Sequence, residues 1–423
     1  VYGPLEASSF IPPTGAPAVV IAWAVRMVQF DQEQLLPAAL AAGQVGEGEI
    51  RELAERLARF HRDAATAGPE TPWGQSEAVL QPVLDNLTAL ADCPGAQAHL
   101  GPLTAWVRQQ AGALQPWFSQ RQRGGHIREC HGDLHLGNML LGDCGIEVFD
   151  ALEFSETLRW IDPISELAFL VMDLAVRGRA DLGTLLLNSW VEASGDGEGL
   201  RGWAWYSVYR ALVRAKVSWL RLKQSGLAAA ESSRIQTELA SYLRLAMNWI
   251  QRQSQPLVLM HGLAGSGKST MAVALSQQLG AVVFRSDVER KRLFGLWGVR
   301  PTRQLEGELY GPAASRHLYA TTLPALVEAA SAGGLAVIVD ACFLRRSERQ
   351  RMVALAGKLG IPVQIVVCTA PEPLLRQRLL ERAAAGSDPS DATVEVLQSQ
   401  QNWLEPLEPD EKGLVMAAEE LAP

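Results

Sequence analysis

The stretch that most constrains the fold of this chain is Gly262-Leu-Ala-Gly-Ser-Gly-Lys-Ser-Thr270. It fits the pattern G-x-x-x-x-G-K-[ST], follows the apolar run PLVLMH and opens a segment with helical composition. A strand, a glycine-rich turn and a helix in this order aim backbone N–H groups at one point, where they can surround a phosphate. The sequence therefore predicts a P-loop NTPase domain, with a parallel sheet, in the second half.

The residue types in this loop indicate ATP with Mg²⁺ as the ligand. Glycine allows the backbone conformations and the close approach that the phosphates require. We expect Lys268 to reach the β and γ oxygens and Ser269 to offer its hydroxyl to Mg²⁺. The loop residues expected to bind the nucleotide are Gly262, Gly265, Ser266, Gly267, Lys268, Ser269 and Thr270.

Beyond the loop, strands alternate with helices, which indicates an α/β fold with helices on both faces of a parallel sheet. The expected strands are 257–260, 281–284, 335–339 and 361–368, and the expected helices include 268–279, 346–358 and 372–384. Asp287 and Asp340 follow strands, at the sheet edge where ligands bind. We expect Asp340 to hold the metal and Asp287 to take a proton from an acceptor hydroxyl, although either could instead cap a helix.

Several arginines could neutralise the charge of a transferring phosphoryl group. Arg376, Arg378 and Arg382 lie on the helix after the fourth strand, and we assign Arg378 to catalysis and the other two to nucleotide binding. Basic residues around Asp287 could bind an anionic substrate: Arg285, Arg290, Lys291 and Arg292. A solvated helix face is the alternative for each of them.

The first half carries a second constellation, His131-Gly-Asp-Leu-His-Leu-Gly-Asn138. An Asp five residues before an Asn is the catalytic-loop spacing of protein-kinase-like enzymes. There Asp133 would be the catalytic base, while Asn138 and Asp150 would bind the metal. An ordinary turn rich in Asp and Asn is the alternative, and His131 is expected to brace the loop.

Coarser patterns organise the rest of this half. We expect a strand at 17–30, an amphipathic helix at 47–65 and mainly helices over 162–251. Helices over 78–121 should break near Pro94–Gly95 and Gly101–Pro102. Two short strands, MLL and IEVF, should follow the 131–138 loop. A change of pattern near Gln253–Pro256 predicts two domains, 1–252 and 253–423.

Residues 256–417 resemble the small P-loop kinases of the AAA_33 type, through the loop and the segments VVFRSDVERKRLFG, VIVDACFLRRSER and PEPLLRQRLLERA. Residues 17–250 resemble the aminoglycoside phosphotransferase and choline kinase superfamily, through HGDLHLGNMLL and EVFDALEF. This second resemblance implies a protein-kinase-like domain with a mostly helical C-lobe. The order of the two parts resembles a bacterial fused protein, an aminoglycoside-phosphotransferase-like domain followed by a predicted kinase.

One departure affects the first half. Such kinases carry a lysine in their N-lobe, but the first lysine here is Lys216, and the N-lobe is largely missing. Either the sequence is truncated or this half is a degraded kinase. We therefore expect weak ATP binding there, and chemistry in the P-loop half.

The leading functional hypothesis is phosphoryl transfer from ATP to a small-molecule hydroxyl acceptor. The alternatives are a nucleotide-sensing protein whose first half binds a partner, and a nucleic-acid 5′-end kinase. A net charge of −8 argues against general nucleic-acid or membrane binding. Five scattered cysteines without a CxxC pair favour reduced thiols in the cytoplasm. The acceptor and the oligomeric state stay open.

Overall fold

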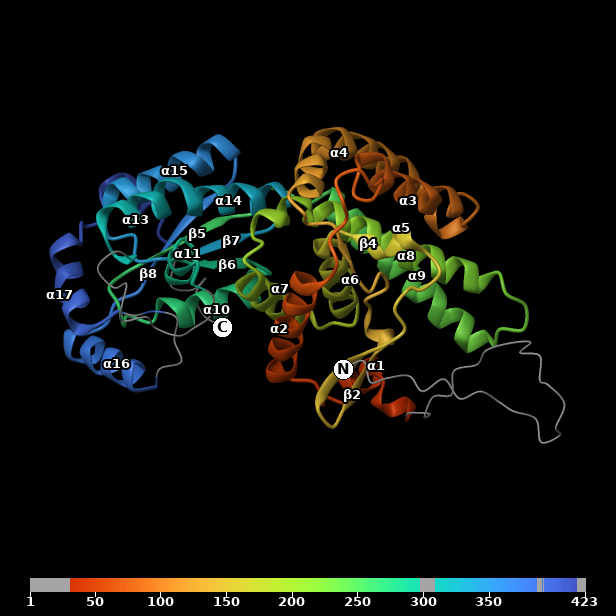
Figure 1. Cartoon of the computed structure of the whole chain (residues 1–423), viewed down its shortest axis with the longest axis horizontal. Coiled ribbons are helices and arrows are strands. Elements are labelled where there is room, and N and C mark those ends of the chain that lie inside the picture. The colour runs from red at the N-terminus through yellow and green to blue at the C-terminus, as the bar shows by residue number, and fades with distance from the viewer. Residues whose placement is uncertain (1–30, 297–308, 386–389, 391, 417–423) are drawn as a thin grey trace.

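The computed structural model describes residues 31–296, 309–385, 390 and 392–416. Helices make up most of the part before residue 251, and a sheet with helices on its two faces follows (Figure 1). The strand expected at 17–30 lies outside the described residues. Within the described ranges, no helix combines the length and apolar composition that a membrane crossing requires.

The first part is built from long helices around an apolar core. They are α1 (Leu36–Ala41), α2 (Glu47–Asp63), α3 (Ser76–Ala89), α4 (Gln97–Arg123), α6 (Pro163–Val176), α7 (Ala180–Ser194), α8 (Trp203–Leu222) and α9 (Ala229–Ile250). Four short strands lie between α4 and α6: β1 (Arg128–Glu129) pairs with β4 (Trp160–Ile161), and β2 (Met139–Gly142) forms a hairpin with β3 (Gly145–Val148). The hairpin and the helices from α2 onward lie in the regions where the sequence predicts them, whereas α1 was not predicted.

The apolar face of α2 differs in one position from the expected one. The helical spacing of apolar residues puts Leu53, Leu57 and Phe60 on one face. Leu53 and Leu57 are buried, but Phe60 is 37% exposed. His61 faces inward instead, because its ring bonds to Glu166 and to the indole of Trp190. The buried face therefore continues from Leu57 to His61, four residues later, rather than to Phe60, three residues later. His61 is polar, so hydrophobic periodicity alone does not place it on the buried face.

The helix break expected at Gly101–Pro102 is wrong. Helix α4 runs without interruption through these residues to Arg123. A proline removes one backbone donor and costs stability inside a helix. Here Leu103 and Val107, which follow it, are fully buried, so packing of this face outweighs the lost hydrogen bond. The break at Pro94–Gly95 is confirmed, since a short 3₁₀ turn, η2 (Pro94–Ala96), separates α3 from α4.

The second part is a four-stranded parallel sheet in the order β6-β7-β5-β8. Its strands are β5 (Leu257–His261), β6 (Val282–Arg285), β7 (Val337–Asp340) and β8 (Val363–Val367). Its helices include α10 (Lys268–Leu279), α11 (Ser286–Arg292), α13 (Pro312–His317), α14 (Leu323–Ala332), α15 (Arg346–Leu359), α16 (Glu372–Ala385), α17 (Val394–Trp403) and α18 (Pro409–Lys412). This confirms the predicted α/β fold with a parallel sheet.

Helix α7 of the first part packs directly against edge strand β6 (Figure 1). The Asn188 amide accepts a hydrogen bond from the N–H of Val283 at 2.7 Å and donates one to the carbonyl of Ala281 at 3.0 Å. A β-carbon on Gly333 would lie 1.9 Å from the carbonyl oxygen of Leu200. The two parts thus meet in van der Waals contact and share one apolar core. The division at residue 252 stays a prediction.

Candidate functional site

The phosphate loop between β5 and α10 requires its glycines. The φ angles of Gly262, Gly265 and Gly267 are 143°, 79° and 95°, which L residues with a side chain rarely adopt. A β-carbon on Gly262 would lie 2.2 Å from the carbonyl oxygen of Cys368, and one on Gly265 would lie 2.9 Å from that of Leu375. Backbone conformation and close packing both select glycine here, as the motif predicts.

Lys268 begins α10 and is almost fully buried, with its ammonium group donating to the carbonyl of Leu263 at 2.8 Å. The buried hydroxyl of Ser266 has no hydrogen-bond partner among the described residues. A buried polar atom without a partner costs free energy unless a ligand satisfies it. The loop thus offers a bound anion an ammonium group and the positive end of a helix.

A cleft of about 840 Å³ opens beside the loop. Gly265, Gly267, Lys268, Ser269 and Thr270 line it, whereas Gly262 and Ser266 lie behind its surface. Asp287 and Asp340 face the same cleft from the ends of β6 and β7. The structure therefore brings the phosphate loop and both predicted aspartates to one cavity.

Asp340 is buried, and Ser269 lies beside its carboxylate. Burial raises the pKa of Asp340, although hydrogen bonding with Ser269 and the nearby charges of Arg285 and Lys268 oppose the increase. A hydroxyl oxygen and a carboxylate oxygen are the hard ligands that Mg²⁺ prefers, and nucleotide phosphates complete its shell in kinases. These two side chains therefore fit a magnesium ion held beside the loop.

The arginines on α16, the helix that is called the lid below, divide into two groups. Arg378 lines the cleft and donates to the Gly265 carbonyl at 3.1 Å, and Arg382 lines it with a buried Nη2 that has no described partner. Arg376 lies elsewhere, paired at 2.7 Å with Glu372 one turn earlier. Its predicted role in nucleotide binding therefore has no support from this geometry, because a neighbouring carboxylate already holds the guanidinium.

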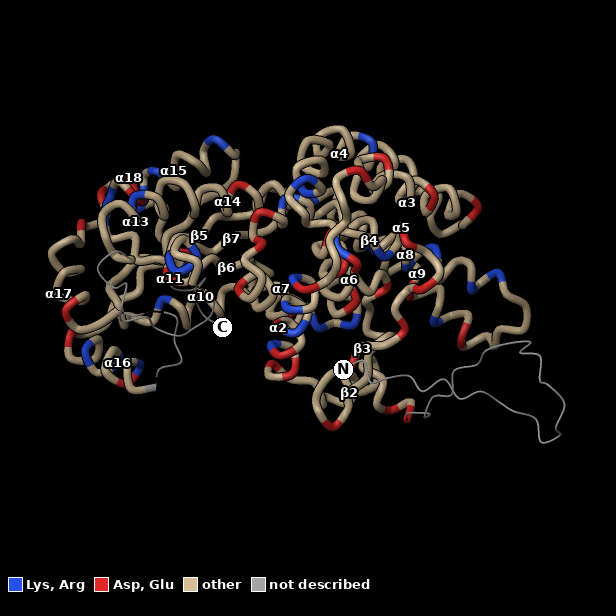
Figure 2. The backbone as a smooth tube through the Cα atoms, viewed as in Figure 1, with Lys and Arg blue, Asp and Glu red and all other residues tan. Residues whose placement is uncertain are grey.

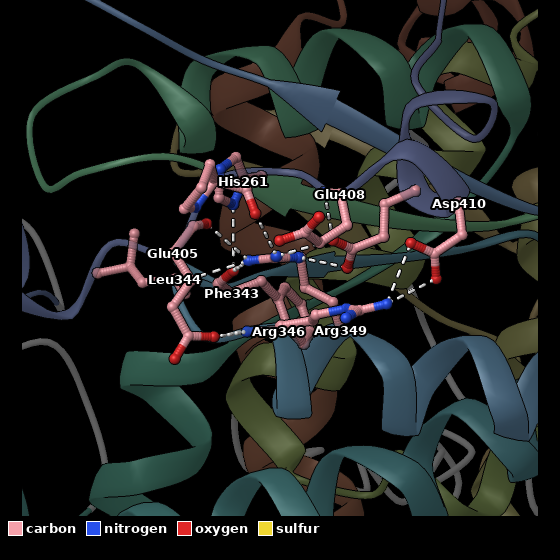
Figure 3. Close-up of polar contacts among 10 residues, drawn as sticks. His261, Phe343, Leu344, Arg346, Arg349, Glu405, Glu408 and Asp410 are labelled. Atoms are coloured by element: carbon pink, nitrogen blue, oxygen red, sulfur yellow. Dashed lines mark hydrogen bonds and ion pairs between the residues drawn. The ribbon is translucent and has the colours of Figure 1, made fainter.

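A buried polar network behind the cleft holds the segment that follows Asp340 (Figure 3). Arg349 is fully buried and donates to the carbonyls of Phe343 and Leu344, each at 3.1 Å. A ring nitrogen of His261 lies 3.1 Å from the same Phe343 carbonyl. Phe343 has a φ of 43°, a strained conformation that persists only where the surroundings fix it.

The same network ties this segment to the end of the described chain. The Arg349 guanidinium bonds to both carboxylate oxygens of Glu411 and to the carbonyls of Glu405 and Pro406. Arg346 pairs with Asp410, so it points away from the cleft. Sequence reasoning missed His261, Phe343, Arg349 and Glu411, and no local motif marks them.

The loop between β1 and β2 in the first part is compact and internally bonded. The Asn138 amide donates to the carbonyl of Asp133 at 3.0 Å and to its carboxylate at 3.2 Å, and His135 lies 3.4 Å from that carboxylate. Burial acts to raise the pKa of Asp133, but its bond with His135 and the nearby charges leave it below the ordinary value. Asp133 and Asn138 are therefore brought together, as their spacing predicts.

Asp150 follows β3 in a left-handed conformation, with a φ of 62°. His131 lies 2.8 Å from the carbonyl of Phe149, the residue before Asp150, so it braces the loop as expected. Asp162 has a structural role, since it caps α6 and pairs with buried Arg121 at 2.7 Å. Glu166, which sequence reasoning missed, accepts from the Gly132 N–H at 2.7 Å.

Comparison with known proteins supports the assignment of the second part. Residues 257–407 match the AAA_33 family, described as an AAA domain. A tRNA dimethylallyltransferase of Anaeromyxobacter dehalogenans is 31% identical over 134 residues, 30% of this chain and 42% of that protein. The loop, the parallel sheet and this match together identify the second part as a P-loop nucleotide-binding domain.

The whole chain has longer relatives. It is 30% identical over 377 residues to the uncharacterized protein Rv2004c of Mycobacterium tuberculosis and to Mb2027c of Mycobacterium bovis, covering 88% of this chain and 74% of theirs. The chain belongs to the family of these mycobacterial proteins.

Solved structures also resemble parts of it. A sugar kinase from Janibacter is 23% identical and covers 40% of this chain and 90% of its own, with a TM-score of 0.28. A gluconokinase from Sinorhizobium meliloti is 20% identical and covers 39% and 82%, with a TM-score of 0.23.

Proposed function

We propose that this protein transfers the γ-phosphate of ATP to a hydroxyl group of a small-molecule acceptor, in the cleft of the P-loop domain. One observation carries the proposal: Lys268, Ser269, Asp287 and Asp340 line the same 840 Å³ cleft. This volume can enclose a nucleotide and leave room for a second small molecule, since ligand pockets measure roughly 300–1,000 Å³.

Each of these side chains would have a separate role in an in-line transfer of the phosphoryl group. Lys268 and Arg378 approach from the loop and the lid, where they offset the charge on the transferring group. Ser269 and Asp340 would hold Mg²⁺, which neutralises phosphate charge when bound. Asp287 accepts the proton of the acceptor hydroxyl as the new O–P bond forms and the bond to the ADP oxygen breaks.

Lys268→Ala tests this assignment directly. Loss of its ammonium group should remove ATP turnover, while the fold, measured by thermal unfolding, is retained. The assay combines purified protein, Mg²⁺, γ-labelled ATP and a panel of hydroxyl metabolites. Turnover that persists unchanged in Lys268→Ala would contradict the assignment, and omission of Mg²⁺ from the wild type should also stop the reaction.

The same panel addresses the two alternative functions. ATP binding that changes conformation without turnover, whatever the acceptor, would favour nucleotide sensing with the first half as a partner-binding module. Labelled oligonucleotide product would favour a nucleic-acid 5′-end kinase, which the net charge of −8 argues against. Stimulation by one metabolite supports the proposed kinase.

We extend this proposal to the first half as an aminoglycoside-phosphotransferase-like unit. The support is its loop, in which Asn138 bonds to Asp133, and the left-handed Asp150. Location in the cytoplasm, without a membrane or nucleic-acid partner, is part of the same proposal and rests on composition.

A further inference from the structure

We propose that the acceptor already carries an anionic group, a phosphate or a carboxylate, bound beside Asp287 by a set of arginines. This inference rests on the proposed function and names the substrate class of the same cleft. Its basis is an excess of positive charge on the side of the cleft away from the phosphate loop.

The described lining of the cleft holds eight Lys and Arg side chains against four Asp and Glu side chains. Lys268, Arg378 and Arg382 belong to the loop and the lid, where the triphosphate is expected. Arg285 pairs with Asp340 at 3.7 Å, beside the expected metal ligands. Four arginines remain on the other elements: Arg290, Arg316, Arg345 and Arg351. Figure 2 shows the basic residues gathered at α11, on a chain whose net charge is −8.

Arg290 is the member of this set whose side chain is buried and held in place by hydrogen bonds. Its side chain is 6% exposed, and its Nη1 donates to the carbonyl of Leu309 at 2.9 Å and to the hydroxyl of Ser315 at 3.0 Å. Its guanidinium lies over the ring of Tyr310, 5.0 Å from the centroid. Its buried Nε nevertheless has no hydrogen-bond partner in the described structure.

A buried guanidinium that is positioned but not neutralised is costly unless a ligand supplies the missing charge. Its planar fork suits the oxygens of a phosphate or carboxylate. Carboxylates on this side are few, and Asp287 is reserved for the acceptor hydroxyl. A neutral acceptor would leave the surplus uncompensated, whereas an anionic one would satisfy it.

Arg351 provides a second, exposed member of the set. It begins the second turn of α15 and lines the cleft, with no hydrogen bond or ion pair to another described residue. Its removal therefore tests the charge of the site without disturbing a buried network. Substitution of Arg290 tests whether the buried guanidinium binds the anion. Substitution of exposed Arg351 tests the same site with little risk that the variant fails to fold.

The decisive experiment measures anion binding without relying on turnover. The full chain is saturated with Mg²⁺ and a non-hydrolysable ATP analogue, and inorganic phosphate and acetate are titrated separately by calorimetry. One of the two anions should bind, and the one that binds identifies the anionic group. Arg290→Met and Arg351→Met should each weaken that binding about tenfold or more.

Arg244→Met, which removes an exposed arginine on α9, is the matched control and should leave anion binding unchanged. The inference is overturned if neither anion binds while the nucleotide analogue does, or if both cleft variants bind as tightly as the control. Failure of the nucleotide analogue to bind would instead count against the proposed function. The two failures are therefore distinguishable.

Discussion

The guanidinium of Arg349 and the carboxylate of Glu411 form a two-bond ion pair, at 2.7 and 2.9 Å, in the interior of the P-loop domain. Both residues are at least 98% buried. The pair fastens the segment after Asp340 to the last described residues, and it keeps Phe343 in its strained conformation. The segment after Asp340, which lines the cleft with Cys342, Leu344 and Arg345, therefore depends on two residues that do not line the cleft themselves.

Breaking this pair should destabilise the protein strongly. Arg349→Met leaves a buried carboxylate without its partner, which costs about 3–5 kcal/mol. Thermal or urea unfolding would measure the loss. Arg351→Met, two residues further along the same helix but exposed, is the matched control and should change stability by less than about 0.5 kcal/mol.

The same pair predicts a dependence of stability on pH. Hydrogen bonds from Arg349 lower the pKa of Glu411 from its ordinary value. A carboxyl group whose pKa is lower in the folded state binds fewer protons there than when unfolded. Its contribution is complete above the unfolded pKa and is lost as the pH falls below about 4. Glu411→Gln should reduce this loss in unfolding curves measured from pH 7 to pH 3, and an identical loss in the variant would contradict it.

Asp287→Asn should preserve ATP binding and abolish most of the phosphoryl transfer. The amide keeps the shape of the side chain but cannot accept the proton of the hydroxyl, which should lower kcat by about 10²–10⁴-fold. The KM for ATP should stay within a factor of about two, since Asp287 acts on the acceptor. A variant with unchanged kcat would remove Asp287 from the reaction and leave the nucleotide site intact.

The contact between the two parts predicts a contrast between two glycine substitutions. Gly333→Ala would place a β-carbon 1.9 Å from the Leu200 carbonyl oxygen and should destabilise the chain by about 1–3 kcal/mol. Gly357→Ala, in the exposed face of α15 with nothing within 4 Å, should stabilise it by about 0.5–1 kcal/mol. Differential scanning calorimetry would measure both. Equal effects would mean that the parts do not press together at Gly333.

Asp133→Asn should leave ATP turnover unchanged. Asp133 belongs to the first half, whereas the proposed transfer takes place in the cleft of the P-loop domain. Steady-state rates of the variant and the wild type, compared at saturating ATP, provide the measurement. A tenfold decrease, with normal thermal unfolding, would place chemistry in the first half and overturn this expectation.

Sequence patterns predicted many of these helices and strands, because the elements depend on residues that are close together in the sequence. The α10 helix spans the residues expected from the phosphate-loop motif, and the four strands were placed to within two residues, since buried parallel strands appear as short apolar runs. Asp340 and Asp287 were found because ligand sites lie at strand ends.

Other features depend on contacts that no local pattern records. Arg349 and Glu411 are 62 residues apart in sequence, so their pairing follows from the fold. Arg376 and Arg378 are both arginines on α16, so the sequence does not distinguish them. The structure shows that Arg376 pairs with Glu372, whereas Arg378 bonds to the phosphate loop. The buried position of His61 likewise depends on Trp190, which lies on another helix.

The amide of Asn188 does for strand β6 what a neighbouring strand would otherwise do, by pairing one N–H and one carbonyl at the margin of the sheet. That strand ends at Arg285 and leads into Asp287. Any shift of α7 would uncover those two main-chain groups and loosen the strand that carries the acceptor side of the cleft. A ligand or partner that moved the first half would thus act on the strand that leads into Asp287, through Asn188 and through the contacts of Arg285 and Arg292 with the end of α7.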